Sequence, residues 1–196
     1  MMSTVIVVVG EALVDLVIDP QGNVTAALGG APFNTARACG RLGADVAFVG
    51  AVSVDRFGSM LAAQLAADGV STAFVPRTDL PTTLAAAELD ERGAATYRFY
   101  FEGTSAPSLT GVPGDPRASV LFTGGLGLVL EPMAAAAEAL VAAAPVTCAV
   151  MVDVNCRPRI VPSREPYVAR VERVLRRADV VKVSDEDLGY LFPDLP

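Results

Sequence analysis

The sequence predicts an α/β fold in which a parallel sheet is flanked by helices on both faces and carries a small separate β-sheet. The parallel sheet is predicted because short apolar, β-branched runs alternate with longer helical stretches, with glycines and prolines between them. The separate sheet is predicted because, near the middle of the chain, short alternating stretches follow one another without a helix. With 196 residues, 52% of them hydrophobic, the chain can bury one full core with a small appendage.

The first third of the chain alternates between strand and helix signals. Its first run, VIVVV, is typical of a strand buried on both faces, and the second strand is interrupted by Asp15. The first helix has Pro32 near its start and Gly43 after its end, and the second begins after Asp55 and ends before Gly69. In order, we expect strands at 5–9 and 13–18, a turn at 20–23, a helix at 32–41, a strand at 45–51 and a helix at 56–67.

The pattern changes at Thr72, where short strands replace the helices. The tripeptide Glu-Arg-Gly at residues 91–93 indicates a hairpin turn, and the aromatic stretch TYRFYF after it alternates, so one face should contact apolar groups. We therefore expect a small all-β insert within an α/β core. The expected strands are 73–76, 83–90 and 94–101; the expected domains are a core of 1–71 and 102–196 and an insert of 72–101 with part of the strand near 13–18.

The last part of the chain returns to alternating strands and helices. This pattern predicts further β-α-β units, whose strands present ligands at their carboxyl ends. The expected elements are strands at 119–123, 146–154 and 179–183, helices at 132–143 and 166–177, and the start of a helix at 186–191.

Composition excludes several classes of function. The net charge is −7, Lys182 is the only lysine, and no basic stripe exists, so nucleic acid is not an expected partner. The apolar run at 5–9 is too short for a signal core or a membrane span, and the three cysteines are scattered, so we expect a soluble cytoplasmic protein. Because the chain has no histidine, it can form neither a Ser-His-Asp unit nor a His-ligated metal site.

The strongest candidate site is the stretch LGGAPFN. Gly29 and Gly30 leave backbone amides exposed, and Asn34 offers donors and acceptors at close range. Asp15, one strand away, can accept hydrogen bonds from two neighbouring hydroxyls, so the set resembles a clamp for a sugar. The alternative is a tight strand-to-helix turn with a polar cap.

Two other strand ends carry polar groups. Asn155 and Arg157 follow a strong apolar strand, where they could hold a hydroxyl or an anion, or simply be solvated. Ser184 and Asp187 open a helix, where they match a capping box, although acidic groups there could also act on a metal. The glycines at 124–127 lack the third glycine of a dinucleotide fingerprint and indicate a turn, and no P-loop is present.

Five motifs occur along the chain in this order: GEALVDLV, LGGAPFNTARACGRLGADVAFVGAVSVDRFG, GTSAPSL, DVNCRPRI and VKVSDEDL. Together they resemble the N-terminal part of the ribokinase-like (PfkB-type) carbohydrate kinases, nearest the fructokinase and 2-keto-3-deoxygluconate kinase branch. The resemblance extends over nearly the whole chain. It implies a ribokinase-like core with a β-sheet lid, the lid being the insert at 72–101. It also implies that the core is incomplete, the C-terminal part of the fold being absent.

The resemblance also implies transfer of the γ-phosphate of ATP to a sugar hydroxyl, with Mg²⁺. Arg157 would act at the sugar or the transferring phosphate. Lys182, Ser184 and Asp187 would contact the nucleotide, Asp187 reaching Mg²⁺ through water where the family usually has Glu. The residues implied to bind the sugar are Asp15, Gly29, Gly30, Asn34, Arg98, Tyr100, Asn155 and Arg157.

One family motif is missing from these residues. The Gly-Ala-Gly-Asp turn, which supplies the family's anion hole and catalytic base, occurs nowhere in the sequence. Since phosphoryl transfer depends on positioning and charge stabilisation, we expect sugar binding by these residues without turnover. The alternatives are a non-catalytic sugar-binding or dimerisation module, with a homodimer formed through the lid, and a nucleoside kinase of the same superfamily.

Overall fold

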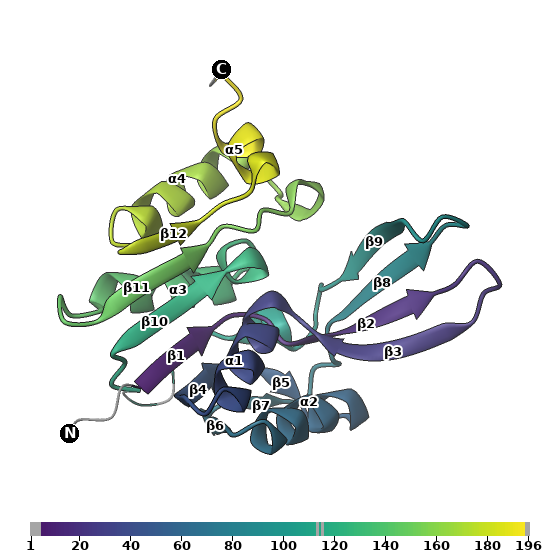
Figure 1. Ribbon diagram of the computed structural model, residues 1–196, viewed down its shortest axis with the longest axis horizontal. Helices are drawn as coiled ribbons and strands as arrows, with labels where there is room; N and C mark the ends of the chain where they lie inside the picture. Colours follow the sequence, from purple (N-terminus) through teal and green to yellow (C-terminus); the bar gives the residue numbers. More distant parts are fainter. Residues whose placement is uncertain (1–4, 113, 115, 195–196) are drawn as a thin grey trace.

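The computed structural model describes residues 5–112, 114 and 116–194. Residues 1–4, 113, 115 and 195–196 of the expected core lie outside the described residues. The chain forms two main sheets, a central six-stranded one and a four-stranded one that projects from it (Figure 1).

The central sheet has the order β12-β11-β10-β1-β4-β6, and all of its neighbouring strands are parallel. A strand with helices on both sides buries successive side chains in opposite directions. In β1, Val7 and Val9 join one buried cluster and Val8 joins the other, which explains the unbroken valine run. The strands are β1 (Val5–Val9), β4 (Asp45–Val49), β6 (Val70–Phe74), β10 (Val120–Gly124), β11 (Ala149–Asp153) and β12 (Val180–Lys182).

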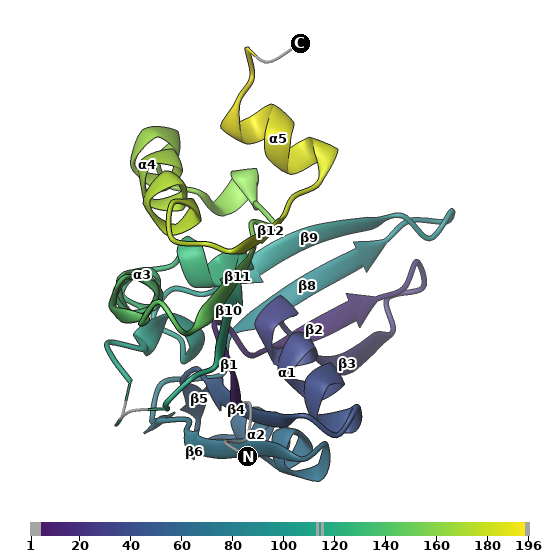
Figure 2. The ribbon, with the colours of Figure 1, turned by 60° about the vertical axis from the view of Figure 1, so that its left-hand side comes forward.

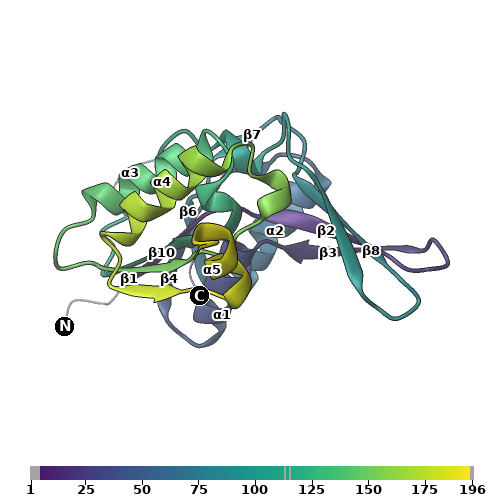
Figure 3. The same cartoon turned by 90° about the horizontal axis from the view of Figure 1, so that it is seen from above.

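Helices cover both faces of this sheet, as the sequence predicts. Figures 2 and 3 show α3 (Met133–Ala143) and α4 (Arg164–Leu175) on one face and α1 (Ala31–Arg41) on the other. Helix α2 (Arg56–Ala67) contributes Leu61 and Leu65 to the buried cluster that contains Val8, to which α1 also contributes. The last helix is α5 (Asp185–Leu191). The longest helices in the described residues have 12 residues, so none is long enough to cross a membrane, which takes about 20.

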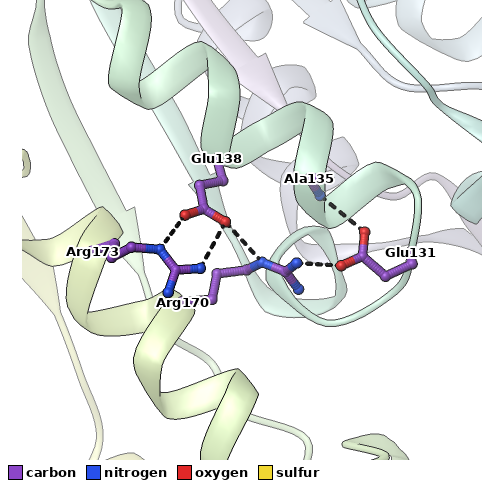
Figure 4. Close-up of polar contacts among 5 residues, drawn as sticks. All are labelled: Glu131, Ala135, Glu138, Arg170 and Arg173. Atoms are coloured by element: carbon purple, nitrogen blue, oxygen red, sulfur yellow. Dashed lines mark hydrogen bonds and ion pairs between the residues drawn. The ribbon is translucent and has the colours of Figure 1, made fainter.

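Half-buried charges join α3 to α4 (Figure 4). Glu138 of α3 accepts hydrogen bonds from Arg170 at 3.1 Å and from Arg173 at 2.5 and 3.2 Å. Arg170 also contacts Glu131, whose other oxygen accepts from the Ala135 amide at 3.2 Å. The hydrogen bond from Arg173 is the main reason that the pKa of Glu138 lies below its usual value. These pairs fix how the two helices lie against each other.

The four-stranded sheet has the order β3-β2-β8-β9, with β2 and β8 parallel and both outer pairs antiparallel. It extends away from the carboxyl ends of the central strands (Figure 1). Its strands are β2 (Leu13–Ile18), β3 (Val24–Gly29), β8 (Leu84–Leu89) and β9 (Ala95–Tyr100). A pair of two-residue strands, β5 (Val52–Ser53) and β7 (Arg77–Thr78), and three short 3-10 helices, η1 (Ala106–Ser108), η2 (Gly125–Leu128) and η3 (Pro158–Ile160), complete the described fold.

The expected boundaries of the second sheet differ from the observed ones in two places. The expected start at Thr72 falls inside β6, which pairs with β4 at the edge of the central sheet. This strand follows directly on Gly69, whose positive φ of 81° turns the chain from α2 into the strand. The sequence also predicts no strand at β3, an exposed, alanine-rich segment that becomes a strand by pairing with β2 along its whole length.

Candidate functional site

A pocket of about 340 Å³ lies between the central sheet and the four-stranded sheet. From β1 the central sheet continues along the chain to β4 and β6 on one side of β1, and then from β10 to β11 and β12 on the other side. The strand order therefore reverses between β1 and β10. In open parallel sheets, ligands bind at the carboxyl ends of the strands at this reversal. The residues that line the pocket are Glu11, Leu13, Asp15, Gly30, Ala31, Asn34, Tyr97, Phe99, Gly125, Leu126, Asn155 and Arg157.

The paired glycines allow three segments to meet at the pocket. A Cβ on Gly29 would lie 2.1 Å from Oδ2 of Asp15, so this carboxylate occupies the space that a side chain would take. Gly30, the residue before α1, has φ 109° and ψ 130°, and a Cβ there would lie 2.6 Å from the carbonyl oxygen of Glu11. Only glycine combines that backbone conformation with so close an approach.

Three polar side chains reach the pocket with hydrogen-bonding capacity to spare. In the part of the chain that the structure describes, Asp15, Asn34 and Asn155 line the pocket, and none of them makes a side-chain hydrogen bond or ion pair. Burial raises the pKa of the half-buried Asp15 carboxyl. One carboxylate and two amides together offer both acceptors and donors to a hydroxyl-rich ligand.

Arg157 and Asn155 lie on the connection between β11 and η3. Arg157 donates from Nη1 to the carbonyl oxygens of Cys156 at 3.0 Å and Asn155 at 3.3 Å, which directs an exposed guanidinium toward the pocket rim. Asn155 has a positive φ of 40°, a conformation that asparagine tolerates better than most residues and that often marks functional sites. The structure thus brings together the predicted residues Asp15, Gly30, Asn34, Asn155 and Arg157.

The aromatic side chains at the pocket differ from the predicted lid residues. Tyr97 and Phe99 of β9 line the pocket, stacked with ring centroids 6.1 Å apart, whereas Arg98 and Tyr100 do not. Successive side chains of a strand point to opposite faces, so residues 98 and 100 lie on the other side of β9. Arg98 there pairs with Glu88 at 3.2 Å. The alternation of TYRFYF predicts two faces but not which of them meets the pocket.

Sequence reasoning missed Glu11, which is only 3% exposed beside the pocket. Its Oε1 accepts from the Ala31 amide at 3.1 Å, and its Oε2 accepts from the Gly127 amide at 3.2 Å. Burial raises its pKa to about 7, although these hydrogen bonds and the charge of Arg157 act in the opposite direction. The signal in the sequence was a carboxylate placed two residues after the last residue of a buried strand.

The residues predicted to meet the nucleotide do not line this pocket. Lys182 lies 3.0 Å from Oδ1 of Asp153, and Ser184 and Asp187 form a capping box at the start of α5. Asp187 is 3% exposed, and its oxygens accept from the Cys156 amide at 2.6 Å and from the Ser184 amide and hydroxyl, both at 2.8 Å. Burial would raise the pKa of Asp187, but these hydrogen bonds outweigh it and lower the pKa.

The same contacts decide how well Asp187 fits a metal. Its carboxylate is already engaged by three protein donors, and the described residues contain no group of three acidic or cysteine side chains that could hold a metal ion. Mg²⁺ needs several oxygen ligands in octahedral geometry. The residues present therefore do not form a Mg²⁺ site by themselves.

A larger cavity, of about 820 Å³, lies at the opposite end of the central sheet. It is bordered mainly by apolar side chains around the starts of β10 and β11 and toward the end of α3, among them Leu121, Leu140 and Cys148. A binding site for a small polar molecule instead needs several polar groups that converge on it. For this reason the smaller pocket is the candidate site.

The parallel central sheet, the four-stranded sheet and the pocket at the strand-order reversal define a ribokinase-like α/β protein. The chain belongs to the pfkB family of carbohydrate kinases, whose family model matches residues 3–194. It is 35% identical over 190 residues to a fructokinase of Rhizobium leguminosarum bv. trifolii, covering 92% of this chain and 57% of that protein. The prediction of this family from the sequence motifs is confirmed.

Solved structures give the same result. The fructokinase of Xylella fastidiosa with bound ATP matches with a TM-score of 0.85 and 29% identity, over 97% of this chain and 64% of that one. The fructokinase of Vibrio cholerae O395 in its fructose-, ADP- and calcium-bound form matches with a TM-score of 0.84 and 27% identity, over 98% of this chain and 64% of that one. The predicted fold class is confirmed, and the chain spans less than two thirds of the length of these relatives.

Proposed function

We propose that this chain is the sugar-binding part of a fructokinase-like enzyme that transfers the γ-phosphate of ATP to a hydroxyl of a sugar or sugar acid. The observation that carries the proposal is the convergence of Asp15, Asn34 and Asn155, all with open hydrogen-bonding capacity, on one pocket. Similarity to fructokinases, one of which is described with bound fructose and ADP, supports fructose as the first sugar to test.

Each pocket residue has a role that follows from its chemistry. The Asp15 carboxylate accepts hydrogen bonds from two neighbouring hydroxyls, and Asn34 both donates to and accepts from the sugar. Gly29 and Gly30 leave room for this approach. Tyr97 and Phe99 provide apolar contact for the sugar ring on the side of the four-stranded sheet.

Arg157 is proposed to stabilise negative charge at the pocket rim. Its exposed guanidinium can bind a phosphoryl oxygen in the bidentate manner typical of arginine. In phosphoryl transfer, catalysis is mainly positioning and electrostatic stabilisation, and excluding water directs the phosphoryl group to the sugar. The second sheet, which borders the pocket through β9, is proposed to act as the lid that excludes water.

ATP as the phosphoryl donor is supported by family membership and by the relative described with bound ATP. Contacts of Lys182, Ser184 and Asp187 with the nucleotide remain a prediction. Because these residues do not assemble a Mg²⁺ site, the proposed requirement for Mg²⁺ rests on family resemblance.

The proposed partner and location follow from surface features. The edge strands β3 and β9 carry exposed apolar side chains, including Val24 at 59% and Tyr100 at 55% exposure, which supports a homodimer formed through the lid. Cys39, Cys148 and Cys156 are all free thiols, as expected for the reducing cytoplasm that we propose as the location.

Calorimetric titrations of the 196-residue chain with D-fructose and, separately, with ATP test this proposal. We expect weak fructose binding, and no turnover in an ATP-coupled assay with fructose or ketodeoxygluconate, because the Gly-Ala-Gly-Asp turn is missing. Binding of ATP without binding of D-fructose would contradict the proposed site. Clear turnover by the purified chain would contradict the view that it lacks the catalytic half.

A further inference from the structure

Glu11 connects two segments that are far apart in the sequence. One carboxylate oxygen accepts from Ala31 in the first turn of α1, and the other accepts from Gly127 in η2. Both segments line the pocket, α1 through Gly30 and Asn34 and η2 through Gly125. The carboxylate is 3% exposed, so water cannot replace either contact easily.

The charged groups around Glu11 are few. The first turn of α1 and the η2 segment contribute no titratable side chain, since their pocket residues are glycine, alanine, leucine and asparagine. The connection after β11 contributes Arg157, whose positive charge favours the ionised carboxylate. The remaining titratable groups in the pocket lining are Asp15 of β2, whose negative charge would oppose ionisation, and Tyr97 of β9.

We propose that Glu11 is a positioning residue for the sugar site: as a carboxylate it holds the start of α1 and the η2 segment together, and protonation loosens the pocket. The ionised form accepts both backbone N–H groups at once. In the protonated form, one oxygen carries an O–H and becomes a weaker acceptor for the amide that faces it. The proposal deepens the proposed function and rests on it, because the pocket that Glu11 shapes is the proposed sugar site.

The pKa of about 7, raised mainly by burial, places this change close to neutral pH. If only the ionised form is competent to bind, the apparent Kd rises by the inverse of the ionised fraction, which gives about tenfold weaker binding at pH 6 than at pH 8. Binding should therefore tighten as the pH rises through 7 and then level off.

The first test is calorimetric titration of D-fructose at pH 6, 7 and 8 into the wild-type chain, Glu11→Gln and Glu91→Gln. Glu91 lies in the exposed hairpin turn after β8 and is the matched control. We expect about a tenfold change in Kd for the wild type and the control. Glu11→Gln should bind weakly at all three pH values, because its amide group cannot accept from the second N–H. The same pH dependence in Glu11→Gln would assign the effect to Asp15 and overturn the proposal, as would a flat wild-type profile.

A second readout needs no sugar. In ¹H–¹⁵N NMR spectra of the ligand-free chain, the amide signals of Ala31 and Gly127 should move together with one midpoint near pH 7, and they should not do so in Glu11→Gln. Separate midpoints, or a midpoint near the usual value of 4.5 for Glu, would overturn the proposal. If fructose binds at none of the pH values, the proposed function is contradicted. The pH dependence of the Ala31 and Gly127 amide signals then tests the role of Glu11 by itself.

Discussion

Gly30→Ala should destabilise the chain by about 4 kcal/mol, because it combines backbone strain with a steric clash of the new Cβ. Gly30 has φ 109°, and the added Cβ would lie 2.6 Å from the backbone oxygen of Glu11, which cannot move away without shifting β2. Denaturant unfolding followed by circular dichroism measures the effect. Gly111→Ala is the matched control, since Gly111 has open space around it and no positive φ.

Gly29→Ala should have a different effect from its neighbour. A Cβ at Gly29 meets the end of the Asp15 side chain, 2.1 Å from Oδ2, and this side chain can rotate away. We therefore expect a folded protein in which the Asp15 carboxylate is displaced and fructose binding is lost. Equal loss of stability in the two variants would contradict the separate roles given to the two glycines.

Asp15→Ala should weaken fructose binding about a hundredfold, because two hydrogen bonds to a charged acceptor are lost, at about 1.5 kcal/mol each. Asp15→Asn keeps one acceptor oxygen and should lose about tenfold. Calorimetric titration at pH 8 measures both variants against the wild type, under conditions where Glu11 is ionised.

Replacing Asp15 with Asn should weaken fructose binding but should not lower the stability of the folded chain. Burial raises the pKa of this carboxyl, so its ionised form is disfavoured in the folded state, and stability falls as the pH rises through the folded-state pKa. At neutral pH, Asp15→Asn should therefore be as stable as the wild type or slightly more so, a trade of stability for binding that is common at functional sites. If Asp15→Ala binds fructose as tightly as the wild type does, Asp15 is not the sugar clamp.

The central sheet could be predicted because its strands carry their own signal. A run such as VIVVV is buried on both faces between layers of helices, so its composition alone indicates its place. By contrast, β3 is exposed along most of its length and becomes a strand only by pairing with β2. Its residues therefore contain little information about their structure.

The site was predictable where backbone geometry dictates residue type and less so where distant segments converge. Gly29, Gly30 and Asn34 are adjacent in sequence and in space, and Asp15 is paired with Ala27 in the neighbouring strand β3. The role of Glu11 depends on α1 and η2 meeting around one carboxylate, which no local pattern encodes. The choice of Tyr97 and Phe99 over Arg98 and Tyr100 depends on how β9 packs against the core.

The location of the sugar site can be measured directly by titrating the ¹⁵N-labelled chain with D-fructose and following the backbone amide signals. We predict that the largest shifts occur at Asp15, Gly30, Asn34 and Asn155, which come from three separate segments and meet only at this pocket. Shifts confined to the apolar cavity near Leu140 and Cys148, or no shifts at saturating fructose, would contradict the account.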